Sequence, residues 1–152
     1  MSTVRGGRKF EEAMAELAKK VGARGRNTVL RVGFLENATY PDGKPVAMIA
    51  AIQEYGAPRA GIPPRPFFRS MIEAKQGEWP AAIRQLLIDN DYDVQKTLDM
   101  AGAAIAGQLR QSITEFEGTP LKPATIKRKG FAKQLVDTGH MLASVDHEVK
   151  SG

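Results

Sequence analysis

Apolar residues recur every three or four positions in several segments of this chain, the spacing that places them on one face of an α-helix. The pattern predicts an amphipathic helix over Arg8–Val21, ending at Gly22, and a short helix over Val46–Tyr55, ending at Gly56. Further helices are predicted over Phe67–Lys75, from Trp79 to a break at Asp89-Asn90-Asp91, and over Val94–Thr114, the longest.

Two other segments alternate between apolar and polar residues. Thr28–Leu35 is predicted as a mostly buried strand, and Val145–Lys150 as a terminal strand. The remaining local predictions are a basic loop at Ala23–Asn27, a turn at Asn37–Lys44, and single helical turns at Thr125–Lys129 and His140–Ser144, the latter capped by Asp137 or Thr138. These elements predict an α+β fold, with a small twisted, mostly antiparallel sheet packed against several helices.

A proline-rich segment follows the short helix. Pro58, Gly61, Pro63, Pro64 and Pro66 are incompatible with a regular helix or a central strand. The apolar side chains of Ile62, Phe67 and Phe68 nevertheless require burial. We therefore expect an extended arm over residues 57–66, without regular structure as far as Phe68. The arm would deliver the two aromatic rings to the domain or to a neighbouring subunit.

The composition indicates one globular domain spanning residues 1–152, with a flexible N-terminus at 1–7. The chain is 42% hydrophobic and 26% charged, which is ordinary for a folded protein. The longest apolar run, Val46–Ile52, is too short to span a membrane, and no secretory signal is visible. The absence of cysteine excludes a disulfide and a thiolate zinc site.

The net charge of +5 is unevenly distributed along the sequence. Between Gly118 and Val136 the chain carries basic residues and no acid, namely Lys122, Lys127, Arg128, Lys129 and Lys133. Such a run is compatible with a solvated surface and with a patch that faces nucleic-acid phosphates.

No constellation of residues suited to catalysis is visible. His140 and His147 lack the spacing of a metal motif, and Asp89, Asp91 and Asp93 lack the glycine and closing glutamate of a calcium loop. Helix capping explains the aspartates and the Asp137-Thr138-Gly139 sequence better than catalysis does. We therefore expect no enzymatic activity, no cofactor and no metal.

Aromatic and arginine residues suggest a contact surface instead. Trp79, Phe67 and Phe68 are not interleaved with the basic run, so packing is favoured over base stacking. Arg65 and Arg69 flank a Pro-Phe-Phe unit, as a solvated rim or as ion pairs across a subunit contact. The candidate interface residues are Tyr55, Arg65, Pro66, Phe67, Phe68 and Arg69.

Two blocks of sequence resemble one family. Glu54-Tyr55-Gly56 followed by Ile62-Pro63-Pro64-Arg65-Pro66-Phe67-Phe68 resembles the helix-EYG and P-x-R-P-F motifs of the neck, or tail-completion, proteins of long-tailed bacteriophages. Pro120-Leu121-Lys122-Pro123-Ala124-Thr125, with Leu135 to Ser144, resembles that family's C-terminal P-L-x-P-x-T and D-T-G-x-L-x-x-S block. Both matches occur in the family's order.

The resemblance implies a virion structural protein, made in the host cytoplasm, that joins head to tail without contacting a membrane. It implies a self-assembled, hexameric ring between the head connector and the tail-tube or terminator proteins. DNA would pass through the lumen in transient, nonspecific contact, with the basic run as the candidate surface. The alternatives are a tail terminator ring, a free basic nucleic-acid-binding protein, and a small hydrolase for which no acid or histidine cluster is visible.

Overall fold

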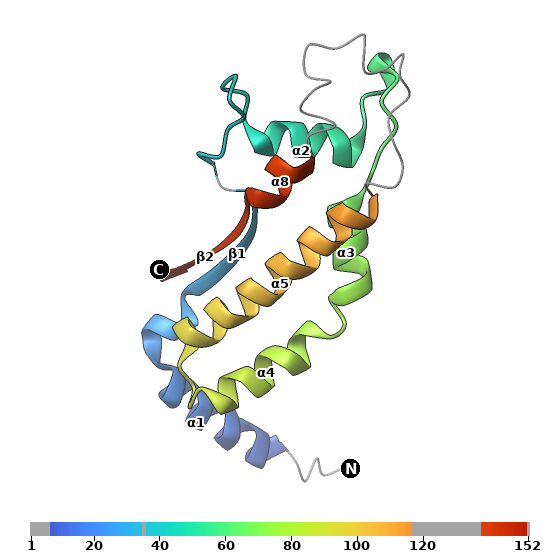
Figure 1. The fold of residues 1–152 in the computed structure, drawn as a ribbon. Helices are drawn as coiled ribbons and strands as arrows, with labels where there is room; N and C mark the ends of the chain where they lie inside the picture. The colour runs from blue at the N-terminus through green and yellow to red at the C-terminus, as the bar shows by residue number, and fades with distance from the viewer. Residues whose placement is uncertain (1–6, 35, 117–137, 152) are drawn as a thin grey trace, which may run out of the picture.

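The computed structural model describes residues 7–34, 36–116 and 138–151 (Figure 1). In chain order its elements are α1 (Gly7–Arg26), β1 (Thr28–Phe34), α2 (Val46–Tyr55), the short 3-10 helix η1 (Pro58–Ala60), α3 (Phe67–Lys75), α4 (Trp79–Asp89), α5 (Val94–Phe116), α8 (Thr138–Ala143) and β2 (Val145–Ser151). The fold is α+β, as predicted, with several helices packed around a small antiparallel sheet.

The sheet joins segments from opposite ends of the chain. Within the described residues it has two strands, β1 and β2, which pair antiparallel from Thr28↔Ser151 to Phe34↔Val145. Exposure alternates along β1, where Val29 and Arg31 are exposed and Leu30 and Val32 are half-buried. The prediction of a mostly buried strand was therefore wrong, because α5 covers one face of this sheet and leaves the other to solvent.

Helix α5 runs along the length of the molecule and packs against the sheet, α3 and α4 (Figure 1). Its approach to the sheet depends on Gly102. A Cβ atom at that position would lie 2.5 Å from Cδ2 of His147 and 2.6 Å from Cδ1 of Leu30. The small residues of this segment predicted close packing, and at Gly102 that prediction is confirmed.

The predicted bounds of α2 and α3 are confirmed, and α5 ends at Phe116 instead of Thr114. At the N-terminus, Gly22 interrupts the helical backbone with φ 72°, as its predicted position at a helix end requires. The helix then resumes as far as Arg26, so the predicted basic loop at Ala23–Asn27 was wrong, because alanine and arginine are good helix formers.

At the two ends of the described chain, Gly7 already belongs to α1, and α8 begins before the predicted turn at His140–Ser144. The rest of the predicted flexible N-terminus and the predicted turn at Thr125–Lys129 lie outside the described residues.

The aspartate cluster between α4 and α5 forms a tight turn and a cap. Asp91 and Tyr92 both have positive φ angles, 51° and 63°. The Asp93 carboxylate then accepts a hydrogen bond from the backbone N–H of Lys96 at 3.1 Å, within the first turn of α5. Capping therefore accounts for Asp93, as expected. No group of three or more potential metal ligands occurs among the side chains that the structure describes.

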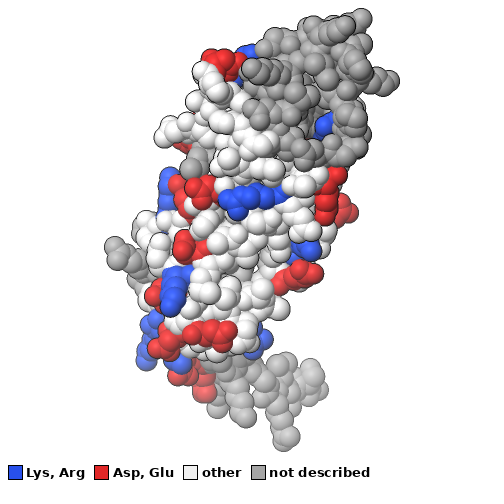
Figure 2. Space-filling view, in the orientation of Figure 1, with Lys and Arg blue, Asp and Glu red and all other residues white. Residues whose placement is uncertain are grey.

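The hydrophobic core joins α2, α3, α5, α8 and the β1–β2 sheet. Its buried members are Tyr40, Val46, Ile49, Ala50, Ile62, Phe67, Met71, Ala106, Leu109, Ile113, Met141 and Val145. Trp79 packs against this core and donates its indole N–H to Oε1 of Gln108 at 2.9 Å, which favours a packing role over base stacking. On the face shown in Figure 2, acidic and basic side chains are interspersed. No described helix has the length and apolarity needed to cross a membrane.

Candidate contact site between α2 and α3

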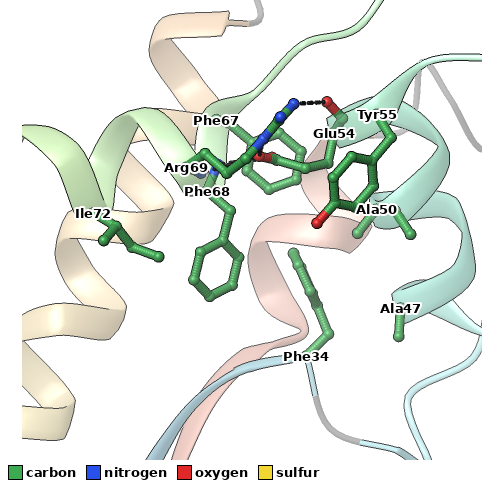
Figure 3. Close-up of a pocket in the computed structure, with 10 residues that line it drawn as sticks. Phe34, Ala47, Ala50, Glu54, Tyr55, Phe67, Phe68, Arg69 and Ile72 are labelled. Atoms are coloured by element: carbon green, nitrogen blue, oxygen red, sulfur yellow. Dashed lines mark hydrogen bonds and ion pairs between the residues drawn. The ribbon is translucent and has the colours of Figure 1, made fainter.

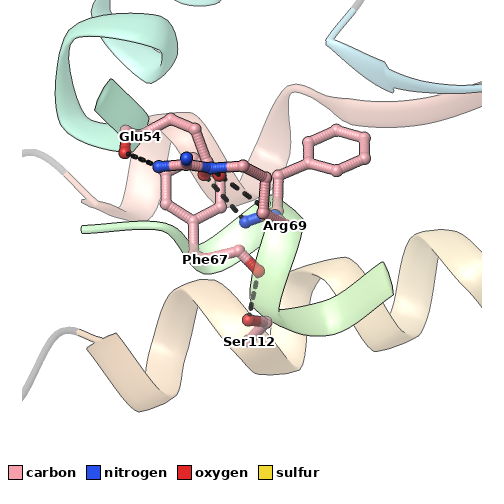
Figure 4. Close-up of polar contacts among 5 residues, drawn as sticks. Glu54, Phe67, Arg69 and Ser112 are labelled. Atoms are coloured by element: carbon pink, nitrogen blue, oxygen red, sulfur yellow. Dashed lines mark hydrogen bonds and ion pairs between the residues drawn. The ribbon is translucent and has the colours of Figure 1, made fainter. Parts of the chain in front are cut away.

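Glu54, near the end of α2, caps the start of α3. Its carboxylate accepts hydrogen bonds from the backbone N–H groups of Phe68, at 2.9 Å, and Arg69, at 3.0 Å (Figure 4). Helix N-termini leave these N–H groups without partners and carry partial positive charge, so a carboxylate stabilises them. Pro66, the residue at the cap position itself, makes no side-chain cap. Glu54 supplies from α2 the cap that the local sequence lacks.

The same carboxylate orients Arg69. Arg69 donates from Nε to Glu54 Oε1 at 2.9 Å and from Nη2 to the Glu54 carbonyl oxygen at 2.9 Å. Its guanidinium carbon lies 4.8 Å from the centre of the Tyr55 ring, within cation–π range. The Glu54 side chain is 7% exposed and the Arg69 side chain 54%, and Tyr55 as a whole residue is 65% exposed. A buried anion therefore holds two exposed side chains in one arrangement (Figure 3).

The proline-rich segment folds back onto α2. Gly56 has φ 71°, and a Cβ there would lie 2.8 Å from the carbonyl oxygen of Ile62 and from the nitrogen of Pro64. Ile62 is buried in the core, and the N–H of Arg65 donates to the carbonyl oxygen of Gln53 at 2.6 Å.

The expectation of an extended arm was therefore wrong in part. The segment contains η1 and an isolated Ala57↔Ile62 bridge, and Phe67 and Phe68 already belong to α3. Glycine's access to positive φ and the buried Ile62 side chain turn the chain back on itself.

Phe67 and Phe68 have different environments. Phe67 is buried, and its ring lies edge-on to the Phe34 ring with the two ring centroids 6.4 Å apart. Its carbonyl oxygen accepts a hydrogen bond from Ser112 Oγ at 2.6 Å. Phe67 thus ties α3 to β1 and α5, and the expectation that one of the two rings is buried is confirmed. Phe68 is half-buried and lines a pocket with Ile72.

This pocket has a volume of about 350 Å³ and opens between α2, α3 and the end of β1 (Figure 3). Its lining residues are Phe34, Ala47, Ala50, Ala51, Glu54, Tyr55, Phe67, Phe68, Arg69 and Ile72. The outward face of α2 borders it, and Ala47, Met48 and Ala51 are exposed there. From Val46 to Gln53 the helix carries no charged residue. We name this outward face and the pocket beside it the α2 surface.

Arg65 lies half-buried next to Pro66. Its Nε and Nη2 atoms are buried and have no hydrogen-bond partner within the described part of the chain. Burial lowers the pKa of Arg65 from its ordinary value, although an arginine remains charged at neutral pH. Two guanidinium nitrogens of Arg65 are therefore removed from water without a hydrogen-bond partner among the described residues, which is unfavourable.

The structure brings together Tyr55, Phe68 and Arg69 at one surface, places Phe67 in the core, and leaves Arg65 and Pro66 half-buried in the preceding segment. Sequence reasoning missed Glu54 as the residue that organises the site, and it missed the outward residues Ala47, Met48 and Ala51. The available signal was the uncharged character of Val46–Gln53, since a helix with one solvated face normally carries charges there. Lys122, Lys127, Arg128, Lys129 and Lys133 lie outside the described residues.

Comparison of the chain with protein-family models, with curated proteins and with solved structures found no match.

Proposed function

We propose that this protein is a structural component of a bacteriophage virion, which forms an oligomeric ring at the neck and joins the tail to the head connector. Two sequence blocks in the family's order support the proposal, and the α2 surface is the observation that carries it. An apolar helix face beside an apolar pocket is a feature of surfaces that bind another protein.

The α2 surface has the composition of an interface centre. Tyr55, Phe68 and Arg69 belong to residue types that are enriched at interfaces, and Glu54 orients the Arg69 side chain, which in turn lies over the Tyr55 ring. Because their orientation is already set, less conformational entropy is lost on association. The proposed contact therefore involves the outer face of α2 and the start of α3, in place of the free arm expected from the sequence.

The remaining parts of the proposal follow from the family resemblance. The ring is hexameric, its neighbours are the head connector and the tail-tube or terminator proteins, and DNA passes through its lumen. Lys122, Lys127, Arg128, Lys129 and Lys133 would face that DNA through weak contacts sensitive to salt. The protein acts through shape and contact and catalyses no reaction.

A complementation experiment tests the contact. Met48, on the α2 surface, is 43% exposed, and Ile88, on α4, is 46% exposed, so they form a matched pair. We expect Met48→Asp to leave a folded protein that fails to join heads to tails, because a charge would be buried at the contact. Ile88→Asp should complement normally. Unattached heads and tails are counted by electron microscopy, and folding is checked by circular dichroism.

The form of the defect separates the neighbouring functions. Free heads accumulating beside tails of normal length indicate a neck protein, whereas tails of abnormal length indicate a tail terminator. Normal virions from Met48→Asp would contradict the proposed contact. Tight duplex binding by the monomer at low salt would favour the nucleic-acid-binding alternative, and hydrolytic turnover by the purified protein would favour an enzyme.

A further inference from the structure

The two edges of the β1–β2 sheet differ in how they are closed. On β2, the Val145 carbonyl oxygen accepts a hydrogen bond from Arg110 Nη2 at 2.7 Å, and the His147 N–H donates to Asp146 Oδ1 at 2.7 Å. Along β1, residues 29–34 have no comparable contact to their backbone groups within the described parts of the chain. Among the described residues, side chains thus bind two backbone groups at the β2 edge and none at residues 29–34 of the β1 edge.

The register identifies the backbone groups at the β1 edge. In an antiparallel pair, alternate residues direct their N–H and C=O groups away from the partner strand. The outward backbone groups of Val145 and His147 bind side chains, as described above. In the sheet these two residues lie opposite Phe34 and Val32 of β1. Leu30, Val32 and Phe34 therefore present backbone groups at the outer edge of β1. Such an edge is a template for another strand, and β1 has neither lysine nor proline to prevent pairing.

We propose that the outer edge of β1 pairs antiparallel with β1 of a second copy of this chain, about a two-fold axis at Val32. In this register Val32 lies opposite Val32 of the second copy, and Leu30 lies opposite Phe34. Leu30, Val32 and Phe34 share one face of the strand, the face that α5 covers at Leu30. The pairing therefore continues an apolar face across both copies and favours β-branched and aromatic cross-strand contacts.

Charge disfavours two alternative registers, those centred on Arg31 and on Leu30. Pairing centred on Arg31 would place two arginines directly opposite each other, which is unfavourable. Pairing centred on Leu30 would place Arg31 opposite Val29 of the second copy, whose β2 neighbour is Lys150, another cation.

Pairing centred on Val32 places Arg31 opposite Gly33 of the second copy, whose β2 neighbour is Asp146. Gly33 has no side chain to intervene, so Arg31 extends across it toward that carboxylate. Within its own chain, Arg31 already lies 3.6 Å from Glu148. On each side of the two-fold axis, Arg31 of one copy thus lies between Glu148 of its own chain and Asp146 of the second copy.

The contact shares only Phe34 with the α2 surface and uses none of the residues of the outward face of α2, so it can be tested separately from the neck proposal and is expected of the purified protein. A charge exchange tests it by sedimentation velocity over a range of protein concentrations. Arg31→Asp and Asp146→Arg should each weaken dimerisation roughly 5- to 50-fold. The double variant, which restores opposite charges across the axis, should recover most of the loss. Lys96→Asp, an exposed site on α5, controls for the change in net charge.

A wild-type protein that remains monomeric at its highest soluble concentration would overturn the inference. An oligomer that Arg31→Asp leaves unchanged would also overturn it, while leaving the proposed ring untouched. Equal weakening by Lys96→Asp would attribute the effect to net charge and contradict the specific contact.

Single cysteines test the register directly, because the chain has none of its own. Directly opposed residues with paired backbones have Cα atoms about 5.5 Å apart, within disulfide range. We expect Val32→Cys to form a disulfide-linked dimer on mild oxidation, and Val29→Cys to form little. Val29 is the more exposed of the two, so random collision would favour the opposite result. Equal or greater crosslinking through Val29→Cys would refute pairing about Val32.

Discussion

Replacing Glu54 by glutamine removes one charge from the joint between α2 and α3 and leaves the shape of the side chain nearly unchanged. The native carboxylate accepts two backbone N–H groups of α3 and the Nε of Arg69. A glutamine retains one acceptor oxygen, but its amide nitrogen then faces a backbone N–H, so one hydrogen bond is lost and another is weakened. Hydrogen bonds to a charged group are worth about 1.5–3 kcal/mol each, and loss of a helix cap costs about 1 kcal/mol. We expect Glu54→Gln to lower the free energy of unfolding by about 2 kcal/mol.

The cap should account for most of this loss, and the ion pair for little. Arg69 is 54% exposed, and an exposed ion pair contributes about 0.2–1 kcal/mol. The capped N–H groups lie at a partly buried helix end, where unpaired donors are costly. Arg69→Gln alone should therefore cost less than half of what Glu54→Gln costs. Glu54→Gln should remain strongly destabilising when it is introduced into the Arg69→Gln protein.

Urea denaturation followed by circular dichroism at neutral pH measures all of these differences, with Glu73→Gln as the matched control. Glu73 is an exposed carboxylate on α3, so its replacement should stay within about 0.5 kcal/mol. Equal losses from Glu54→Gln and Glu73→Gln would refute the capping argument. A loss from Arg69→Gln as large as that from Glu54→Gln, with no further loss in the double variant, would show that the ion pair dominates.

Two further stability predictions follow from the packing. Gly102→Ala should cost about 1–3 kcal/mol because its Cβ would overlap His147, whereas Gly107→Ala on the same helix, with open space around it, should be neutral or stabilising; thermal unfolding of both variants tests this, and equal effects would contradict it. Phe67→Ala should cost about 3–5 kcal/mol as a full core position, and Phe68→Ala much less because that ring is half-exposed. Denaturant titration measures both, and a loss below about 1 kcal/mol for Phe67→Ala would place the ring outside the core.

The helices next to the site could be predicted because the residues at their boundaries have strong backbone preferences of their own. Gly56 ends α2, and Pro66 immediately precedes α3, so both bounds follow from backbone preferences alone. The path between them could not be predicted in the same way. It depends on the burial of Ile62 and on a hydrogen bond from Arg65 to Gln53, which exist only once α2 has packed. Prolines restrict the backbone but do not determine the direction in which a segment turns.

The role of Glu54 lies further from what a sequence shows. Its partners, Phe68 and Arg69, are 14 and 15 residues away, and no local capping pattern connects them. The indirect signal is a helix start without its own cap, because Pro66 has no side-chain acceptor. Contacts of this kind arise from tertiary packing, so the sequence shows only that the start of α3 lacks a local capping residue.

The composition of α2 fits the proposed contact better than it fits the needs of the isolated fold. Burial of Val46, Ile49 and Ala50 against the core explains the inward stripe of the helix. Nothing in the described part of the fold requires the outward residues Met48 and Ala51 to be apolar, since lysine or glutamate there would meet solvent and improve solubility. An apolar outward face therefore costs solubility without stabilising the isolated chain. A partner that covers this face recovers that cost, and this argument for a contact at α2 holds independently of any family resemblance.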